Sequence, residues 1–122
     1  HAGGLRYHGM APLVSLLVAQ KVIEPRAYHQ NAIFEAALTF ARSEGRVCAP
    51  ETAHGLRAGI EEALKCKETG EEKCIVILYS GHGFFDLSSY EKYFSESLED
   101  FEYPQENIEK AMKSIPDFEG NE

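Results

Sequence analysis

The chain has 122 residues, a length that suits one domain with a single hydrophobic core. Hydrophobic residues make up 43% of it and charged residues 26%, which is ordinary for a soluble globular protein and argues against disorder over most of the length. The net charge of −8 disfavours binding to nucleic acid, whose phosphates require clustered lysine and arginine.

The longest apolar run near the start, MAPLVSLLVAQ at residues 10–20, is too short to cross a bilayer. It also lacks the basic flank and cleavage site of a signal peptide. We therefore expect a cytoplasmic chain that contacts no membrane. The cysteines Cys48, Cys66 and Cys74 are odd in number and lack metal-type spacing, which predicts reduced and mostly buried thiols.

Three stretches with apolar residues at three- and four-residue spacing predict helices, because this spacing places them on one helix face. The predicted helices cover residues 10–22, 31–45 and 51–67. Pro12 is acceptable in the first turn of the first helix. Gly45 is typical of the glycine that closes a helix, and Gly70 ends the third predicted helix before the next segment.

Short segments between these helices predict extended structure. Residues 46–50 form a brief candidate strand, residues 74–79 are mostly β-branched or apolar, and residues 25–30 are a further candidate. Because helices separate the strands and no hairpin signal occurs, we expect right-handed crossovers and a parallel sheet. The predicted fold is α/β, a layered sandwich with a mostly parallel sheet flanked by helices. The residues expected to be among the most buried are Leu56, Ile60, Ile75 and Ile77.

The stretch from Glu91 onward alternates acids with aromatic residues. We expect a solvated helix and cap there rather than an acidic recognition arm, with frayed residues at the end.

Residues 79–86, YSGHGFFD, follow the strand predicted at 74–79. Glycines let a backbone approach a ligand closely, and open α/β sheets place their sites at the carboxyl ends of strands. Without further context, the same pattern is typical of an ordinary turn from strand to helix. Two other segments stand at equivalent ends of the predicted pattern, HAGGLRYHG at residues 1–9 and APETAHG at residues 49–55.

In this order and spacing, the three segments resemble the C-terminal third of a tryptophan synthase β subunit, a pyridoxal-phosphate enzyme. The resemblance covers about residues 1–100 and is closest to the second type of β subunit, common in archaea and some bacteria. It implies a part of the fold-type II pyridoxal-phosphate enzyme fold, followed by an acidic tail at residues 101–122. It also implies a lyase that replaces the β-substituent of serine or O-phosphoserine with indole to give tryptophan.

The resemblance assigns cofactor contacts to the first and third segments. It implies that the Ser80 hydroxyl hydrogen-bonds the pyridine nitrogen of pyridoxal phosphate and that Gly4, Gly81 and Gly83 lie against the cofactor. A neutral hydroxyl leaves that nitrogen unprotonated and holds less carbanion charge in the ring, which favours β-elimination and β-replacement. A lone serine at this place also fits a cap on the next helix.

Glu51 follows Pro50 at a predicted helix start, where backbone N–H groups and the helix dipole favour a carboxylate by about 0.3 to 1 kcal/mol. That alone explains an acid at this position. The resemblance adds a catalytic role, in which Glu51 faces the cofactor and handles protons beside the attacking indole. We expect His54 to pack the helix. We expect His82, which replaces an arginine of the commoner β subunits, to be structural.

Arg6 stands where the commoner β subunits have an aspartate that handles the serine hydroxyl. A guanidinium suits bidentate recognition of a phosphate or carboxylate, and phosphate leaves more readily than hydroxide. We therefore expect O-phosphoserine to be a β-donor at least as good as serine. Alternatively, Arg6 pairs with one of the 20 acidic residues. The carbonyls of Tyr7 and Gly9 match a monovalent-cation site of the family.

The sequence lacks a His-Lys pair of the kind that carries the Schiff-base lysine and a Gly/Ser/Asn-rich loop for the cofactor phosphate. The lysines in polar or helix-end surroundings do not look like substitutes; they are Lys21, Lys65, Lys67 and Lys73. We therefore expect the C-terminal piece of an enzyme, from a deliberately shortened or a naturally split gene, that is inactive alone. Its expected partner is the remainder of the β chain, in a full-length homodimer, and docking of an α subunit stays open.

Two other interpretations stay open. The chain is either a stand-alone α/β binding or scaffold domain that performs no chemistry, or part of another pyridoxal-phosphate lyase. Relatives of threonine synthase and cysteine synthase fit the segments APETAH and SGHG less well than the tryptophan synthase β subunit does.

Overall fold

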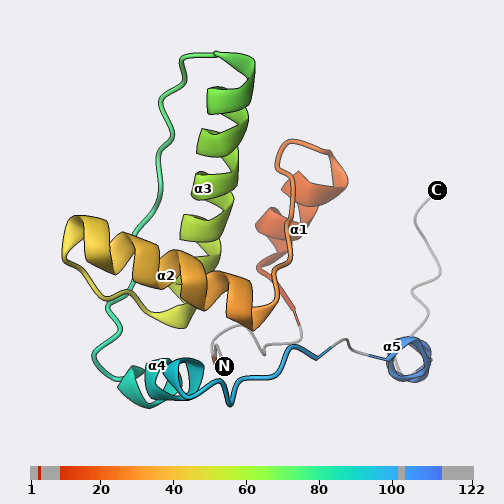
Figure 1. Ribbon diagram of the computed structural model, residues 1–122. Coiled ribbons are helices and arrows are strands. Elements are labelled where there is room, and N and C mark those ends of the chain that lie inside the picture. Colours follow the sequence, from red (N-terminus) through yellow and green to blue (C-terminus); the bar gives the residue numbers. More distant parts are fainter. Residues whose placement is uncertain (1–2, 4–8, 102–103, 114–122) are drawn as a thin grey trace.

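The computed structural model describes residue 3 and residues 9–101 and 104–113. Within these residues the chain forms five helices: α1 (Pro12–Ala19), α2 (Gln30–Glu44), α3 (Pro50–Thr69), α4 (Leu87–Phe94) and α5 (Gln105–Met112). Figure 1 shows α2 lying across the N-terminal half of α3, with α4 against the other side of α2. In the described part of the chain, α1 and α5 pack against no other helix.

The three predicted helices are confirmed, although α1 is shorter than residues 10–22. Gly45 and Gly70 follow α2 and α3 with φ of +69° and +73°, the left-handed region that glycine enters without steric cost. Each donates its N–H to the carbonyl four residues earlier, at 3.0 Å for Gly45 and 2.9 Å for Gly70. The glycines therefore end both helices as predicted.

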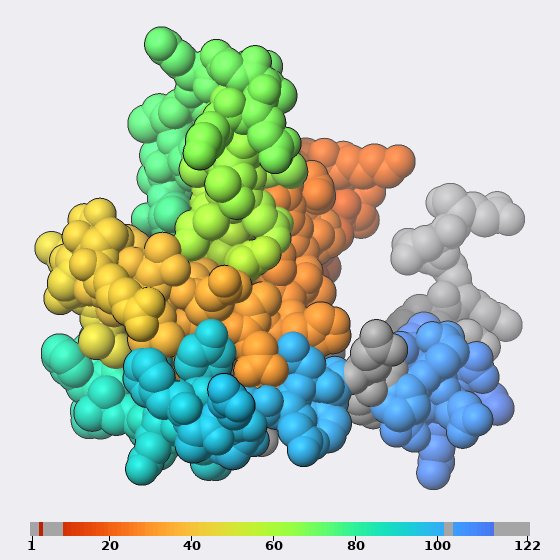
Figure 2. All heavy atoms as spheres, viewed as in Figure 1, coloured from red at the N-terminus to blue at the C-terminus, as the bar shows by residue number. Residues whose placement is uncertain are grey.

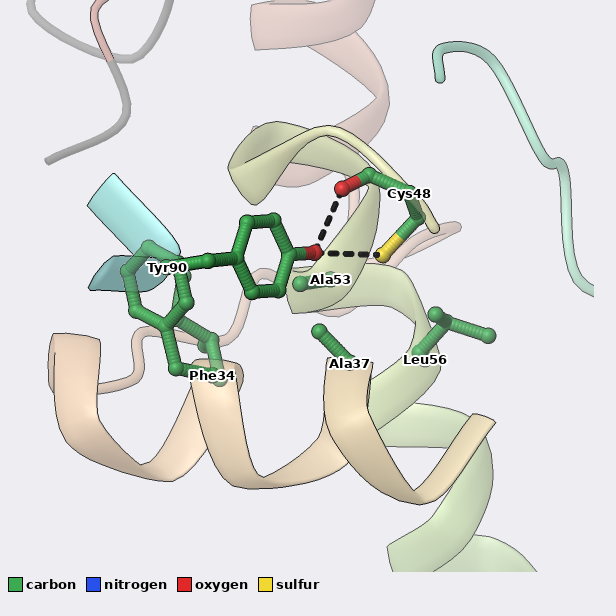
Figure 3. Close-up of a cluster of buried hydrophobic side chains, with 7 residues drawn as sticks. Phe34, Ala37, Cys48, Ala53, Leu56 and Tyr90 are labelled. Carbon is green, nitrogen blue, oxygen red and sulfur yellow. Dashed lines mark hydrogen bonds between the residues drawn. The ribbon is translucent and has the colours of Figure 1, made fainter. Parts of the chain in front are cut away.

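A single core forms where α2, α3 and α4 meet. Its members are Ile33, Phe34, Ala37, Cys48, Ala53, Leu56 and Tyr90. The edge of the Tyr90 ring meets the Phe34 ring with centroids 5.0 Å apart, and the Tyr90 hydroxyl donates a hydrogen bond to the carbonyl oxygen of Cys48 at 2.6 Å (Figure 3). The link between α2 and α3 is therefore fastened to α4 by a buried hydrogen bond as well as by packing.

The predicted parallel sheet is wrong for this chain. Residues 71–81 run as an extended segment alongside α3 (Figure 1), but residues 72–80 make no backbone hydrogen bond to another described residue. Residues 25–30 likewise form no strand. A strand exists only when a neighbouring strand supplies the ladder of hydrogen bonds, and no other described segment supplies one. The described fold is helical rather than α/β.

The strand predicted at 46–50 is reduced to one isolated antiparallel bridge between Cys48 and His82. Two hydrogen bonds flank this bridge. Ala49 N donates to Gly81 O at 2.9 Å, and Gly83 N donates to Val47 O at 2.8 Å. The bridge is antiparallel, so it also contradicts the expected parallel pairing.

The burial predicted for the extended segment is wrong as well. Ile75 and Ile77 face α3 but remain 37% and 36% exposed, while Val76 and Leu78 between them point outward and are 80% and 84% exposed. On α3, Leu56 is buried as predicted. Ile60 is only half-buried, so the prediction of burial is wrong for it too. Figure 2 shows α3 and the extended segment standing out from the body formed by α2 and α4.

The three cysteine thiols differ in burial. Cys48 is buried in the core, Cys66 is half-buried on α3, and Cys74 is exposed in the extended segment. The prediction of mostly buried thiols is therefore correct only for Cys48. Across the described residues, no helix combines the length and hydropathy that a bilayer span requires.

Candidate functional site

Two of the three glycine-containing segments meet at the N-terminal end of α3. The antiparallel bridge lays residues 47–49 against residues 81–83, immediately before Glu51 and immediately after Ser80. The second and third segments are thus joined by an antiparallel bridge, and not by the parallel strand ends that the sequence predicted. In the first segment, Gly4, Arg6 and Tyr7 lie outside the described residues.

Gly9, the described end of that first segment, is exposed. A Cβ built on Gly9 would have no atom within 4 Å. The predicted cation site at the carbonyls of Tyr7 and Gly9 therefore stays a prediction.

Thr52 connects the two meeting segments and is only 4% exposed. Its Oγ1 accepts a hydrogen bond from Gly81 N at 3.1 Å and lies 3.1 Å from the Ser80 Oγ. The same hydroxyl lies 3.3 Å from the carbonyl oxygen of Gly81. A threonine hydroxyl carries a single proton, so it donates either to Ser80 or to Gly81 at any one time.

Sequence interpretation missed Thr52, although a signal was present. Thr52 precedes Leu56 by four residues and Gly59 by seven, so it lies on the buried face of α3. A polar side chain on a buried helix face requires a hydrogen-bonding partner, and here the partners are Ser80 and Gly81 at the end of the extended segment.

Gly81 and Gly83 have a packing reason to be glycine. A Cβ on Gly83 would overlap the carbonyl oxygen of Cys48 and lie 2.9 Å from Cγ1 of Val47. A Cβ on Gly81 would lie 3.2 Å from the Cβ of Ala49. The close approach of the two backbones explains both glycines, and the clearance expected for a cofactor ring stays a prediction.

Ser80 is exposed, and its hydroxyl contacts Thr52. A serine hydroxyl has one proton and two acceptor lone pairs, so this contact leaves hydrogen-bonding capacity for a further partner. The alternative interpretation, that Ser80 caps the next helix, is wrong. The N-cap position of α4 is Asp86, and no side chain makes a capping hydrogen bond there.

Charged groups surround this edge of α3. Glu51 is half-buried in the first turn of the helix. Partial burial raises the pKa of Asp86 above its ordinary value, the negative charge of Glu51 raises it further, and His82 opposes both effects. The charges of Glu51 and His82 therefore act on Asp86 across the two segments.

The two histidines make local contacts. His82 is exposed, and its ring lies 4.9 Å from the Phe84 ring and 5.4 Å from the Phe85 ring, measured between centroids. His54 is half-buried, with Nδ1 2.9 Å from the carbonyl oxygen of Pro50 in the preceding turn of α3. His54 thus packs its own helix, as expected.

The larger hollows of the described surface lie elsewhere. One of about 570 Å³ lies between α3 and the extended segment, and one of about 630 Å³ lies between α2 and α4. Neither is lined by Ser80 or Glu51. Among the described residues, no group of three or more His, Cys, Asp and Glu side chains is arranged to hold a metal ion.

Comparison with known proteins gives close relatives. The chain is 62% identical over 100 residues to tryptophan synthase beta chain 2 of Aquifex aeolicus (strain VF5), which is 82% of this chain and 23% of the relative. It is 51% identical over 113 residues to the tryptophan synthase beta chain of Pyrococcus horikoshii, which is 93% of this chain and 25% of the relative. No family model matches the chain.

A third relative, tryptophan synthase beta chain 2 of Methanothermobacter thermautotrophicus, is 59% identical over 98 residues, or 80% of this chain and 23% of the relative. Identities of this size over most of the chain mean common ancestry. The chain is homologous to a segment of tryptophan synthase beta chains. More particularly, its relatives include chains of the second type. It spans about a quarter of the length of the curated relatives that it matches.

Proposed function

We propose that this chain supplies part of the pyridoxal-phosphate site of a tryptophan synthase beta chain. In this proposal, the assembled protein is a lyase of tryptophan biosynthesis that forms tryptophan from indole and serine or O-phosphoserine. The observation that carries the proposal is that Thr52, the neighbour of Glu51 on α3, hydrogen-bonds Ser80 and Gly81 and so joins the two segments. The homology to tryptophan synthase beta chains supports it.

The residues at this edge fit the pyridine ring of pyridoxal phosphate. When bound, the cofactor accepts electron density from the substrate and so makes replacement at the β-carbon accessible. Ser80 is exposed and has a proton to offer, which suits an unprotonated pyridine nitrogen. The half-buried Glu51 carboxylate can hold or move a proton beside the ring.

We propose that the remainder of the beta chain supplies the lysine that binds the cofactor and the loop that holds its phosphate. Two lysines of this chain pair with neighbouring acids away from the site. Lys65 Nζ lies 2.9 Å from a carboxylate oxygen of Glu62, and Lys73 Nζ lies 2.6 Å from one of Glu71. Mixing this chain alone with pyridoxal phosphate and borohydride should therefore trap no stoichiometric adduct. A one-to-one adduct at a single lysine would contradict this part of the proposal.

The catalytic role of Glu51 is tested in the assembled beta chain with Glu51→Gln, which keeps the shape and removes the ionisable group. Turnover should fall by roughly a factor of 10² to 10⁴, the contribution of a positioned acid or base. The matched control is Glu68→Gln, an exposed acid near the other end of α3. Equal turnover in the two variants, with normal cofactor content, would show that Glu51 serves only the helix start.

The choice of β-donor is proposed to depend on Arg6. Arg6→Ala should lower kcat/KM for O-phosphoserine far more than for serine, by roughly 1.5 to 3 kcal/mol, the scale of a hydrogen bond to a charged group. Arg6→Asp should shift the preference further toward serine. Both variants must first bind cofactor normally. Equal losses for the two donors would mean that Arg6 stabilises local structure and does not bind phosphate.

A further inference from the structure

The buried hydroxyl of Thr52 contacts both Ser80 and the backbone of Gly81. We infer that Thr52 is a positioning residue: it directs its proton to the Ser80 oxygen, so that the Ser80 proton points outward to the pyridine nitrogen of the cofactor. This inference rests on the proposed function, in which Ser80 contacts that nitrogen.

The direction of the hydrogen bonds follows from which groups can only donate. Gly81 N–H is a donor without alternative, and it occupies one lone pair of Thr52 Oγ1 at 3.1 Å. The single proton of Thr52 then goes either to Ser80 Oγ at 3.1 Å or to Gly81 O at 3.3 Å. The distance to Ser80 Oγ is the shorter of the two. Donation to Ser80 is therefore favoured.

A Ser80 oxygen that accepts from Thr52 keeps its own proton for another partner. Because Ser80 is exposed while Thr52 is buried, that proton points away from α3. An unprotonated pyridine nitrogen has one lone pair and no proton, so it can be held only by a donor. Successive hydrogen bonds polarise one another, so the chain from Gly81 N–H through Thr52 to Ser80 makes the serine a better donor.

A purely structural role makes a different prediction. If Thr52 only anchors the loop through Gly81 N–H, its loss lowers stability but leaves the bond between Ser80 and the nitrogen as it was. The test therefore needs a readout at the nitrogen itself. Pyridoxal phosphate labelled with ¹⁵N in the ring provides one, because the ¹⁵N chemical shift responds to a hydrogen-bond donor.

The experiment uses the assembled holoenzyme, made by replacing the matching quarter of the Aquifex aeolicus relative with this sequence. Three variants are compared with the parent. Thr52→Val keeps the shape and loses the hydroxyl, Thr52→Ser keeps the hydroxyl, and Ser80→Ala removes the proposed donor. Cofactor affinity and the ¹⁵N chemical shift of the bound ring are measured for each.

We expect Ser80→Ala to move the ¹⁵N shift toward the value of a pyridine nitrogen without a donor. Thr52→Val should move it in the same direction and weaken cofactor binding about two- to tenfold, the scale of one hydrogen bond. Thr52→Ser should restore the parental shift. In the Ser80→Ala background, Thr52→Val should change the shift no further, because the group through which it acts is gone.

The outcomes separate the two proposals. If Ser80→Ala moves the ¹⁵N shift and Thr52→Val leaves it at the parental value, the positioning role is overturned while the Ser80 contact stands. If Ser80→Ala leaves the shift unchanged, both the contact and the positioning role are overturned. Should Thr52→Val fail to assemble, Thr52→Ala is compared with Thr52→Ser, since both lack the methyl group. An identical ¹⁵N shift in those two variants overturns the positioning role.

Discussion

The two sides of α3 are built differently. Toward α2 and α4, the helix contributes Ala53 and Leu56 to a core in which side chains are covered from several directions. Toward the extended segment, it meets Ile75 and Ile77, which stay more than one-third exposed. An apolar run thus becomes buried only when both of its faces pack against neighbours.

Glycines on α3 let the extended segment approach the helix closely. A Cβ on Gly59 would overlap Cδ1 of Ile77, and a Cβ on Gly55 would lie 3.9 Å from Cγ2 of the same residue. The bare helix backbone lets the segment approach closely, yet the outward Val76 and Leu78 remain in solvent. The segment therefore lies beside α3 with its outward side chains left exposed.

Removing a large side chain from each side should give the greatest contrast. Phe34→Ala empties the fully buried centre of the core and should lower the free energy of unfolding by about 3 to 5 kcal/mol. Leu78→Ala removes a side chain that is 84% exposed and should change it by no more than about 0.5 kcal/mol. Urea denaturation followed by circular dichroism measures both. Similar midpoints for the two variants would refute the division.

Gly83→Ala tests the bridge that ties the end of the extended segment to the link between α2 and α3. The new Cβ would overlap the carbonyl oxygen of Cys48, which is backbone and cannot turn away. We expect a loss of about 1 to 3 kcal/mol in the free energy of unfolding. Gly9→Ala is the matched control, because its Cβ would meet nothing within 4 Å. An equally small effect at both positions would mean that the bridge yields readily.

Tyr90→Phe tests the buried hydrogen bond between α4 and the link that joins α2 to α3. It keeps the ring against Phe34 and removes the proton donated to Cys48 O, leaving a buried carbonyl without that donor. The expected loss is about 1 to 2 kcal/mol in thermal or urea unfolding. Tyr93→Phe is the control, because Tyr93 also stacks on Phe34, with centroids 5.7 Å apart. Equal losses would attribute the effect to tyrosine in general.

The smallest expected effect concerns pH. Burial raises the pKa of Asp86 in the folded chain. The stability that the Asp86 carboxyl contributes is therefore fully present below its unfolded pKa of about 3.9. This stability is lost as pH rises through the folded pKa. Asp86→Asn cannot ionise. It should be more stable than the parent at about pH 7, and this advantage should disappear at about pH 3.

Midpoints of thermal unfolding at the two pH values measure this difference. Glu68→Gln removes the same charge at an exposed place and corrects for the net charge of −8. An advantage of Asp86→Asn that is the same at both pH values would show that the Asp86 carboxylate pays no burial cost.

Local features of the sequence predicted local structure well. Apolar spacing and the glycines at 45 and 70 located α2 and α3 and their ends, because these depend on side-chain periodicity and on φ alone. The run at 74–79 predicted a strand, and the structure forms none there, because pairing depends on a neighbouring strand that the described residues do not include. The sequence thus indicates a segment suited to a strand but does not show whether a partner strand lies beside it.

The candidate site shows the same limit. The motif containing Glu51 and the motif containing Ser80 were recognised separately, and their meeting follows from the antiparallel bridge. The sequence did not single out Thr52, because its hydrogen bonds are with residues 28 and 29 positions later, Ser80 and Gly81. Such a partner is visible only once the chain has folded.

The distribution of the cysteines gives the chain a built-in chemical reporter. Cys48 is buried, and burial raises the pKa of its thiol, so an alkylating reagent reacts with it only when the core opens. Cys74 is exposed in the extended segment and is open to the reagent in the folded chain. The alkylation rate of Cys48 thus follows opening of the helical core, while that of Cys74 follows coverage of the extended segment. One labelling reaction, read by mass spectrometry, can therefore follow both regions of the unmutated chain at once.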